Sequence, residues 1–189
     1  MVSLLVQRLA ALQTALICLL WVAGCAGQPP SVGQHLGYHV AVPFFPDDTD
    51  QCGPATLASI LEYWEIPADP KTLKEEIYIA RLKGSLPIDL LLAAQKRGLA
   101  AEIRRGDLGL LKSELERGHP LVAFLNLGLS LFPLGHYVVV TGYDDQRQGL
   151  YVHSAMDRDL FIPYERFLPS WEKTGRWVLV VSSSKQTAK

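Results

Sequence analysis

The chain has 189 residues, of which 49% are apolar and 20% are charged, and this is the make-up of one globular domain. Its 18 Lys and Arg residues nearly balance its 19 Asp and Glu residues, so the formal net charge is −1 at pH 7. This balance leaves no basic surface for a phosphate backbone and argues against a nucleic-acid-binding protein. The three cysteines are too few for a disulfide scaffold.

Residues 1–24 have the pattern of an export signal. One cation, Arg8, precedes an almost continuously apolar run over residues 9–23. A run of this length after a charged start is typical of a secretory signal and is too short for a comfortable membrane span. The run ends in VAGC at residues 22–25, which resembles the bacterial lipobox, where a signal peptidase cuts before a cysteine that then carries lipid. An uncleaved anchor and a plain secretory signal are the alternatives.

The lipobox resemblance implies an outer-membrane lipoprotein that touches the membrane through its lipid anchor only. Cys25 would carry the lipid, and Ala26 follows it in place of the aspartate that often retains lipoproteins at the inner membrane. Residues 25–38 then form the lipidated cysteine and a flexible tether rich in Gly, Pro, Ser and Gln. Residues 39–183 form one folded domain facing the periplasm, and residues 184–189 form a tail.

This processing leaves Cys52 as the one cysteine of the folded domain. Cys18 leaves with the signal peptide, and Cys25 is acylated. Thiols of exported proteins are normally oxidised in pairs, so an unpaired one is a candidate reactive group. The alternative is that Cys52 acts only as a small buried apolar residue.

The first half of the folded domain is predicted to be helical. A helix starts at Cys52 or Gly53, with Pro54 in its first turn and apolar residues at helical spacing at positions 57, 60, 61 and 64. Three further helices are expected over residues 70–81, 87–97 (capped by Ser85) and 108–117.

The second half changes to the period of β-strands. Short apolar or β-branched runs follow, separated by turn-like clusters such as residues 144–149. Helices followed by antiparallel strands indicate an α+β fold, with the helices packed on one side of the sheet. Strands are expected over residues 40–42, 100–103, 121–125, 137–141, 150–152 and 177–181.

Cys52 and His136 are the candidate catalytic pair. At a helix start, unsatisfied N–H groups and the helix dipole favour the thiolate, and Gly53 would let a substrate chain approach closely. A catalytic thiol also needs a base, which is usually histidine. His136 follows Gly135 and opens an apolar strand that would hold its side chain still in a cleft. A hydrogen-bonded histidine at a strand end is the alternative.

Two segments together resemble a known family. QCGPATL at residues 51–57 and GHYVVVTGYD at residues 135–144 are similar to papain-like cysteine peptidases of the bacteriocin-processing, double-glycine leader type, and to their exported lipoprotein relatives. The resemblance covers residues 40–181. It implies a papain-like fold in which helices carry the nucleophile Cys52 and an antiparallel sheet carries His136, with a peptide or protein as substrate.

The third catalytic residue departs from the family pattern. The family places an aspartate at the end of the strand after the histidine strand, where this chain has Ser154. Serine can accept a hydrogen bond from the imidazole but does not stabilise the imidazolium by charge. Asp157 is the alternative if the hairpin bends, whereas Asp144 lies eight residues along the strand from His136, which is over about 25 Å away.

The oxyanion-binding glutamine of the family is missing as well. Pro46 stands at its usual place six residues before the nucleophile, and the carboxylate of the following Asp47 would repel developing negative charge. Gln51, beside Cys52, is the substitute donor that the sequence offers. Loss of one such donor costs about 10²–10³ in rate.

Two further features bear on the cleft. Asn126 ends the strand before the histidine strand and is a candidate cleft residue, and the apolar loop over residues 129–134 is either a peptide-binding wall or a core-packing loop. The sequence contains no HExxH motif, paired CxxC motif or Gly-rich phosphate loop, so we expect no metal, nucleotide or other cofactor.

The sequence therefore predicts a lipid-anchored cysteine peptidase, and it leaves two alternatives open. The missing Asp and Gln are compatible with a weak or inactive peptidase-like module that binds peptides in an envelope assembly. An NlpC-type cell-wall amidase is the second alternative, although that group usually has Ser after an Asp-Cys pair where this chain has Gln51-Cys52-Gly53. The sequence does not indicate an oligomeric state.

Overall fold

The computed structural model describes residues 36–47, 51–129 and 131–183. The predicted signal peptide, Cys25, most of the predicted tether and the tail over residues 184–189 lie outside these residues. Within the described part of the chain, no helix combines the length and the apolar character needed to cross a membrane.

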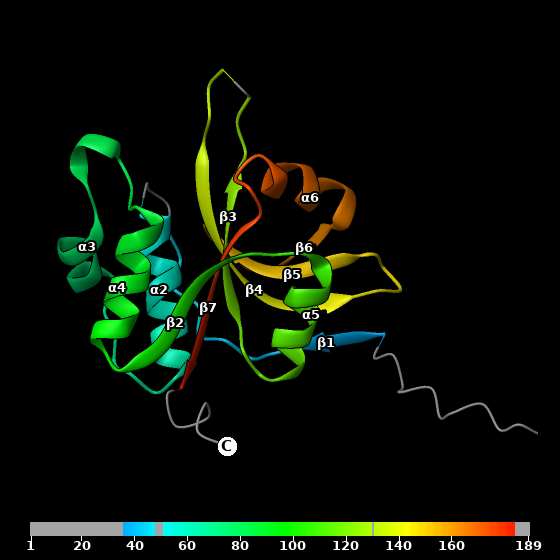
Figure 1. The fold of residues 1–189 in the computed structure, drawn as a ribbon, viewed down its shortest axis with the longest axis horizontal. Coiled ribbons are helices and arrows are strands. Elements are labelled where there is room, and N and C mark those ends of the chain that lie inside the picture. Colours follow the sequence, from blue (N-terminus) through cyan, green and yellow to red (C-terminus); the bar gives the residue numbers. More distant parts are fainter. Residues whose placement is uncertain (1–35, 48–50, 130, 184–189) are drawn as a thin grey trace, which may run out of the picture. The chain divides into compact units, whose positions relative to one another are not determined.

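The described residues form an α+β domain, as predicted (Figure 1). In chain order its elements are β1 (Gly37–His39), α2 (Cys52–Tyr63), α3 (Pro70–Ile77), a 3-10 turn η1 (Ala80–Leu82), α4 (Pro87–Lys96), β2 (Leu99–Arg105), α5 (Leu108–Glu116), β3 (Leu121–Asn126), β4 (Gly135–Asp144), β5 (Gly149–Ser154), β6 (Asp157–Pro163), α6 (Tyr164–Glu172) and β7 (Trp177–Ser183).

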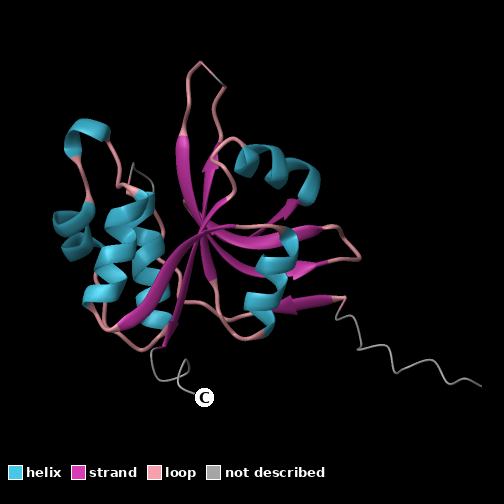
Figure 2. Cartoon of the chain, viewed as in Figure 1, coloured by secondary structure: helices cyan, strands magenta, loops and turns pink. Residues whose placement is uncertain are grey.

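The strands form one antiparallel sheet with helices on both sides (Figure 2). The strand order is β2-β7-β3-β4-β5-β6, and β1 pairs with β4. Helices α2, α3 and α4 lie together on one side of the central strands, and α5 and α6 lie on the other (Figure 1). The expectation that all helices pack on one side is therefore wrong, because α6 buries Phe167 and Trp171.

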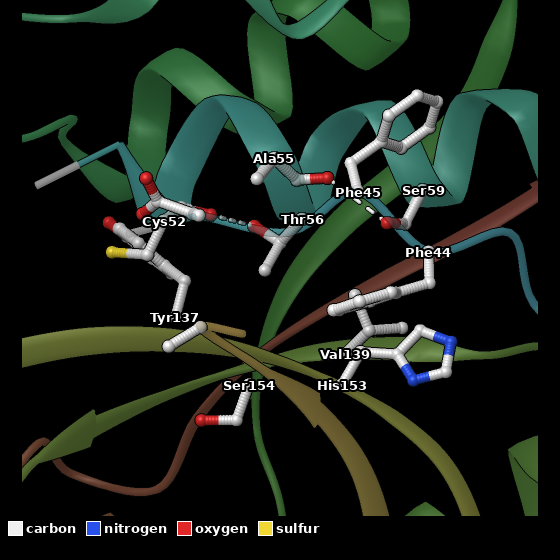
Figure 3. Close-up of a pocket in the computed structure, with 12 residues that line it drawn as sticks. Phe44, Phe45, Cys52, Ala55, Thr56, Ser59, Tyr137, Val139, His153 and Ser154 are labelled. Carbon is white, nitrogen blue, oxygen red and sulfur yellow. Dashed lines mark hydrogen bonds between the residues drawn. The ribbon is translucent and has the colours of Figure 1, made fainter. Parts of the chain in front are cut away.

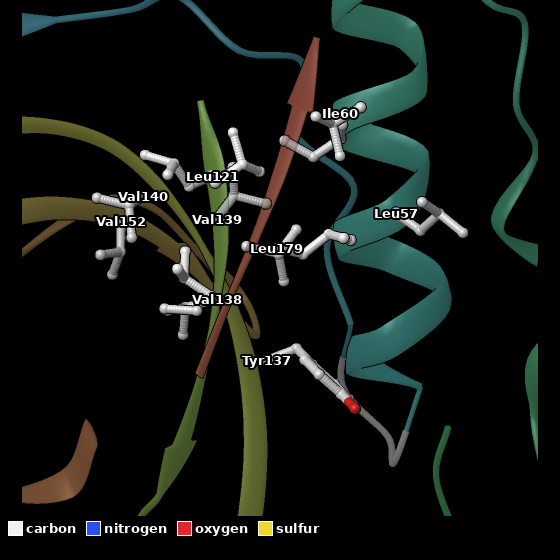
Figure 4. Close-up of a cluster of buried hydrophobic side chains, with 14 of the residues drawn as sticks. Leu57, Ile60, Leu121, Tyr137, Val138, Val139, Val140, Val152 and Leu179 are labelled. Atoms are coloured by element: carbon white, nitrogen blue, oxygen red, sulfur yellow. The ribbon is translucent and has the colours of Figure 1, made fainter. Parts of the chain in front are cut away.

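The core lies on both faces of β3 and β4, whose central residues are almost all buried. Tyr137 points toward α2, whereas Val138, Val140 and Val152 lie on the opposite side of the sheet (Figure 4). Burial on both faces explains why these strands read as continuous apolar runs rather than as alternating ones. This two-sided burial fixes the direction in which each buried residue of β4 points.

β4 is longer than its neighbour β3, and β1 pairs with the part of β4 that extends beyond β3. β3 pairs with β4 only as far as Val140, and β1 pairs with Gly142–Asp144 beyond it. A Cβ atom on Gly142 would lie 2.6 Å from the Tyr38 carbonyl oxygen, so only glycine permits this approach. The predicted strand over residues 40–42 is therefore wrong, and the sheet begins inside the predicted tether, at Gly37.

Three other features of the helices differ from prediction. α3 ends at Ile77 because Tyr78 is extended, and η1 follows it. α4 is not capped by Ser85; instead, the Leu86 N–H donates to the Asp89 carboxylate at 3.3 Å. The sequence analysis missed α6, whose internal Pro169 obscures the helical spacing of its buried residues.

The fit of β1 against β4 gives a testable consequence. We expect Gly142→Ala to lower the free energy of unfolding by about 1–3 kcal/mol, the usual cost of overpacking, because the new Cβ collides with backbone. Chemical denaturation measures this change. Gly84→Ala is the matched control, because the nearest atom to its Cβ lies 4.0 Å away. Equal stability of the two variants would contradict the role of Gly142.

Candidate active site

Cys52 is the first residue of α2, and the local sequence holds it there. Gln51 is the N-cap residue and accepts the Ala55 N–H at 3.1 Å through its carbonyl oxygen, without a side-chain cap. The Thr56 hydroxyl donates to the Cys52 carbonyl oxygen at 2.8 Å. The thiol therefore lies at the end of the helix where backbone N–H groups have no helical partner.

Close packing against Ser85 leaves room only for glycine at position 53. A Cβ atom on Gly53 would lie 2.8 Å from Ser85 Oγ and 2.9 Å from Ser85 Cβ. The expectation that Gly53 makes room for substrate is therefore wrong, because the segment that leads into α4 fills that space. This contact presses the residues before α4 against the start of α2.

His136 lies at the start of β4, and its partner is Ser154. His136 Nε2 lies 2.9 Å from Ser154 Oγ, at the end of β5. Asp157 is exposed and faces Ser154 across the tight turn into β6. The sequence offered two candidates for orienting the imidazole. In the structure Ser154 contacts His136, whereas Asp157 is not among the residues that line the cleft.

Cys52 and His136 line one cleft of about 810 Å³. The cleft is otherwise mainly apolar, with Lys83 and Asp47 as its charged members. A smaller pocket continues from Cys52 beneath the start of α2, where Figure 3 shows Cys52, Tyr137 and Ser154. The apolar residues that line the cleft are Leu82, Leu86, Phe124, Leu127, Pro133, Leu134, Tyr137, Ala155 and Met156.

Burial dominates the electrostatics of Cys52. Desolvation raises the pKa of the thiol above its ordinary value, and the negative charge of Asp47 raises it further. The backbone N–H of Tyr137 opposes this rise, as do those of Gly53 and Cys52 at the helix start. The N–H groups at the helix start therefore act in the predicted direction, but burial outweighs them and raises the pKa of Cys52 in the resting site.

His136 is also favoured in its neutral form. Desolvation lowers the pKa of the imidazole, and the charge of Asp47 acts in the opposite direction. No hydrogen bond joins the Cys52 thiol to His136 among the contacts of these two described residues. A neutral imidazole is the form that can accept a proton from a thiol once the two groups approach within hydrogen-bonding distance.

Asp47 is the site residue that the sequence analysis did not place among the candidates. It is 8% exposed and lines both the cleft and the smaller pocket beside Cys52. Its backbone N–H donates to the Ala155 carbonyl oxygen at 3.0 Å, at the turn between β5 and β6. The sequence analysis considered Asp47 only as a carboxylate that would repel negative charge. Gln51, in contrast, is not among the residues that line either pocket.

A buried histidine supports the segment that carries Asp47. His153 is 3% exposed, and its Nε2 donates to the Val42 carbonyl oxygen at 3.0 Å. The Asp159 N–H donates to His153 Nδ1 at 3.1 Å. These two bonds fix His153 as a neutral imidazole with its proton on Nε2, and they tie the residues before Asp47 to β5.

Asn126 holds the loop between β3 and β4 rather than lining the catalytic cleft. Its Oδ1 accepts the Gly128 N–H at 3.0 Å and the Leu134 N–H at 2.9 Å. Beyond this closure the loop is exposed and apolar, with Leu131 at 87% and Phe132 at 76%. The interpretation of residues 129–134 as a core-packing loop is therefore wrong, and residues at the base of the loop form a wall of the cleft.

Comparisons with known proteins agree with this architecture. The structure is similar to a double glycine motif protease from an AMS/PCAT transporter, solved in complex with the leader peptide, with 25% identity, a TM-score of 0.63 and coverage of 78% of this chain and 95% of that one. The peptidase domain of Streptococcus ComA, a bi-functional ABC transporter, shares the fold at 24% identity and a TM-score of 0.60, with coverage of 77% and 100%.

A third solved structure has a similar fold. Xylellain, a cysteine protease from Xylella fastidiosa, is 13% identical with a TM-score of 0.54, over 84% of this chain and 87% of that one. No curated protein sequence matches the chain. The model of the Peptidase C39 like family matches residues 34–178, which include Asp47, Cys52, His136 and Ser154. The chain belongs to this peptidase C39-like family.

Proposed function

We propose that the protein is a cysteine peptidase in which Cys52 is the nucleophile and His136 is the general base. The observation that carries the proposal is that these two side chains, from α2 and β4, line one cleft while both are held in their neutral forms by burial. Membership of a peptidase family supports the same conclusion.

The reaction follows from these protonation states. His136 accepts the thiol proton, and the sulfur attacks the peptide carbonyl carbon, so that a C–S bond forms and the π electrons move to the oxygen. When the carbonyl re-forms, the C–N bond breaks and the amine leaves with the proton from His136. Water, deprotonated by His136, then attacks the thioester, releases the acid and returns a proton to the Cys52 sulfur.

The substrate that we propose is a peptide with small residues at the cleavage site and apolar residues nearby. The mainly apolar lining of the cleft supports this choice. The related double glycine motif protease was solved with a leader peptide. A peptide that contains a Gly-Gly cleavage site is therefore the first substrate to test.

Removal of the nucleophile tests the proposed activity. We expect Cys52→Ala to lower kcat/KM for a Gly-Gly peptide by about 10³-fold or more, as for other nucleophile deletions. Mass spectrometry of the products measures cleavage, and an unchanged thermal unfolding curve shows that the fold is intact. Cleavage by Cys52→Ala at the rate of the unsubstituted chain would contradict the proposal. The peptide-binding module would be favoured instead if the unsubstituted chain did not cleave the peptide and if Cys52 reacted with iodoacetamide no faster than a free thiol.

Ser154 is the positioning residue that we propose for His136. Loss of one neutral hydrogen bond costs about 0.5–1.5 kcal/mol, so we expect Ser154→Ala to lower kcat about 2- to 10-fold with little change in KM. Ser154→Asp should raise the pKa of His136, because a carboxylate favours the imidazolium; NMR titration of the histidine measures this shift. Asp157→Ala is the matched control, and an equal loss in both alanine variants would exclude a specific role for Ser154.

We also propose that Cys25 anchors the protein in the outer membrane, with the peptidase domain in the periplasm. The VAGC sequence at residues 22–25 and the absence of aspartate at residue 26 support this location. In a bacterial host fed labelled palmitate, Cys25→Ala should lose the label, whereas Cys18→Ala should keep it. Ala26→Asp should move the protein to the inner-membrane fraction. Labelling that survives Cys25→Ala would refute the anchor.

A further inference from the structure

The side chain of Tyr137 connects the sheet to the helical half of the domain. Tyr137 is 2% exposed, and its side chain reaches from β4 toward α2 (Figure 4). Its hydroxyl donates a hydrogen bond to the Ser85 carbonyl oxygen at 3.0 Å. Burial raises the pKa of this hydroxyl well above its ordinary value, so the group keeps its proton and remains a donor. The bond therefore holds the segment that leads into α4 against β4.

Ser85 extends this connection to the residue that follows the nucleophile. Its side chain packs so closely on Gly53 that a Cβ atom there would lie 2.8 Å from Ser85 Oγ and 2.9 Å from Ser85 Cβ. Ser85 Oγ is buried and has no hydrogen-bond partner among the described residues, so the hydroxyl does not fix Ser85 in place. Ser85 therefore contacts the start of α2 by packing alone, and the bond from Tyr137 to its carbonyl oxygen holds it there.

The backbone of Tyr137 lies on the other side of the nucleophile. Its N–H acts on the Cys52 thiol as a hydrogen-bond donor, in addition to the N–H groups at the helix start. His136 is the preceding residue of β4 and lines the same cleft as Cys52. Tyr137 thus meets the nucleophile through its backbone and restrains the helix start through its side chain, and it adjoins the base in the chain.

The chemical step is sensitive to small shifts of this helix start. Proton transfer from the thiol requires the sulfur and the imidazole to approach within hydrogen-bonding distance. A displacement of reacting groups by about 1 Å can lower a rate by about 10²-fold. A bond that keeps the start of α2 against β4 is therefore expected to act on the chemical step more than on substrate binding.

We propose that the Tyr137 hydroxyl is a positioning group for the nucleophile. Acting through Ser85 and Gly53, it keeps the start of α2 where the Cys52 sulfur can pass its proton to His136. The proposal rests on the peptidase function proposed above. The hydroxyl donates to the Ser85 carbonyl oxygen throughout and gives no proton to the substrate, so the bonds that form and break are those of the reaction already described.

The experiment compares two Tyr→Phe variants of the full chain. Tyr137→Phe removes the hydroxyl and keeps the ring and the backbone N–H. Tyr63→Phe is the matched control, because the Tyr63 hydroxyl also donates to a backbone carbonyl oxygen, that of Gly118 at 2.6 Å. Tyr63 is the last residue of α2, at the opposite end of the helix from Cys52. Chemical denaturation of both variants measures what each bond contributes to stability.

The probe for the reaction is the p-nitrophenyl ester of N-acetylglycine. The signal is the release of nitrophenol in a single turnover, with the protein in excess, after subtraction of the release by Cys52→Ala. The dependence of the rate on protein concentration gives the maximal acylation rate and the half-saturating concentration separately. These two values distinguish an effect on the chemical step from an effect on binding.

We expect Tyr137→Phe to lower the maximal acylation rate about 10- to 10²-fold and to change the half-saturating concentration less than about twofold. Tyr63→Phe should lose a similar amount of stability, because it also loses one hydrogen bond to a carbonyl oxygen, but should acylate at the rate of the unsubstituted chain. Ser85→Gly keeps the carbonyl oxygen that Tyr137 binds and removes the side chain that packs on Gly53. It should therefore be slowed in the same way as Tyr137→Phe.

Each other outcome has a distinct meaning. An unchanged maximal rate in Tyr137→Phe, or a change confined to the half-saturating concentration, overturns the positioning role and leaves the peptidase intact. An equal loss of rate in Tyr63→Phe shows that lower stability is the cause, and this also overturns it. A Ser85→Gly variant at full rate excludes the route through Gly53. If the unsubstituted chain gives no release that depends on Cys52, the peptidase function itself fails, and the role of Tyr137 fails with it.

Discussion

Tyr137 makes the contact on which the rest of the site depends, because it joins the helical half of the domain to the sheet. Its hydroxyl donates to the Ser85 carbonyl oxygen at 3.0 Å, and its backbone N–H favours the thiolate of Cys52. Its ring packs against Phe124 with the ring centroids 4.5 Å apart. Because His136 is the preceding residue of the same strand, the contacts that hold Tyr137 also hold His136 in place relative to Cys52.

Burial, rather than the helix start, decides the resting state of this site. The N–H groups at the start of α2 act on the thiol in the expected direction, but the cost of desolvating a charge in the cleft is larger. The same cost keeps His136 neutral. Because Cys52 and His136 are both favoured in their neutral forms, they do not form an ion pair in the free protein. In the proposed reaction, the charges would then develop only as the proton moves from the thiol to the imidazole. In the proposed reaction, Ser154 contacts the imidazole on which the positive charge would develop.

The sequence was sufficient for the fold class and for most of the sheet. Apolar runs that are buried on both faces, such as those of β3 and β4, are recognisable because no polar residue interrupts them. β1 was misplaced because its position depends on the absence of a side chain at Gly142, 103 to 105 residues further along the chain. The burial of Asp47 was not foreseen for a related reason: the backbone bond that fixes its segment is made to the β5–β6 turn, which local spacing does not encode. Gln51 was favoured because it adjoins Cys52, but adjacency in the chain did not place its side chain in the cleft.

Because Asn126 closes the β3–β4 loop, the register of β4 does not depend on the length or sequence of that loop. One side-chain oxygen binds amides at both ends of the loop, so the ends of β3 and β4 stay together whatever the intervening residues do. A one-residue slip within β4 would turn His136 to the other face of the sheet, whereas a change of length or sequence within the loop leaves the strand in register. The wall of the cleft that Pro133 and Leu134 form can therefore change through this loop while the start of β4, which carries His136, stays in place.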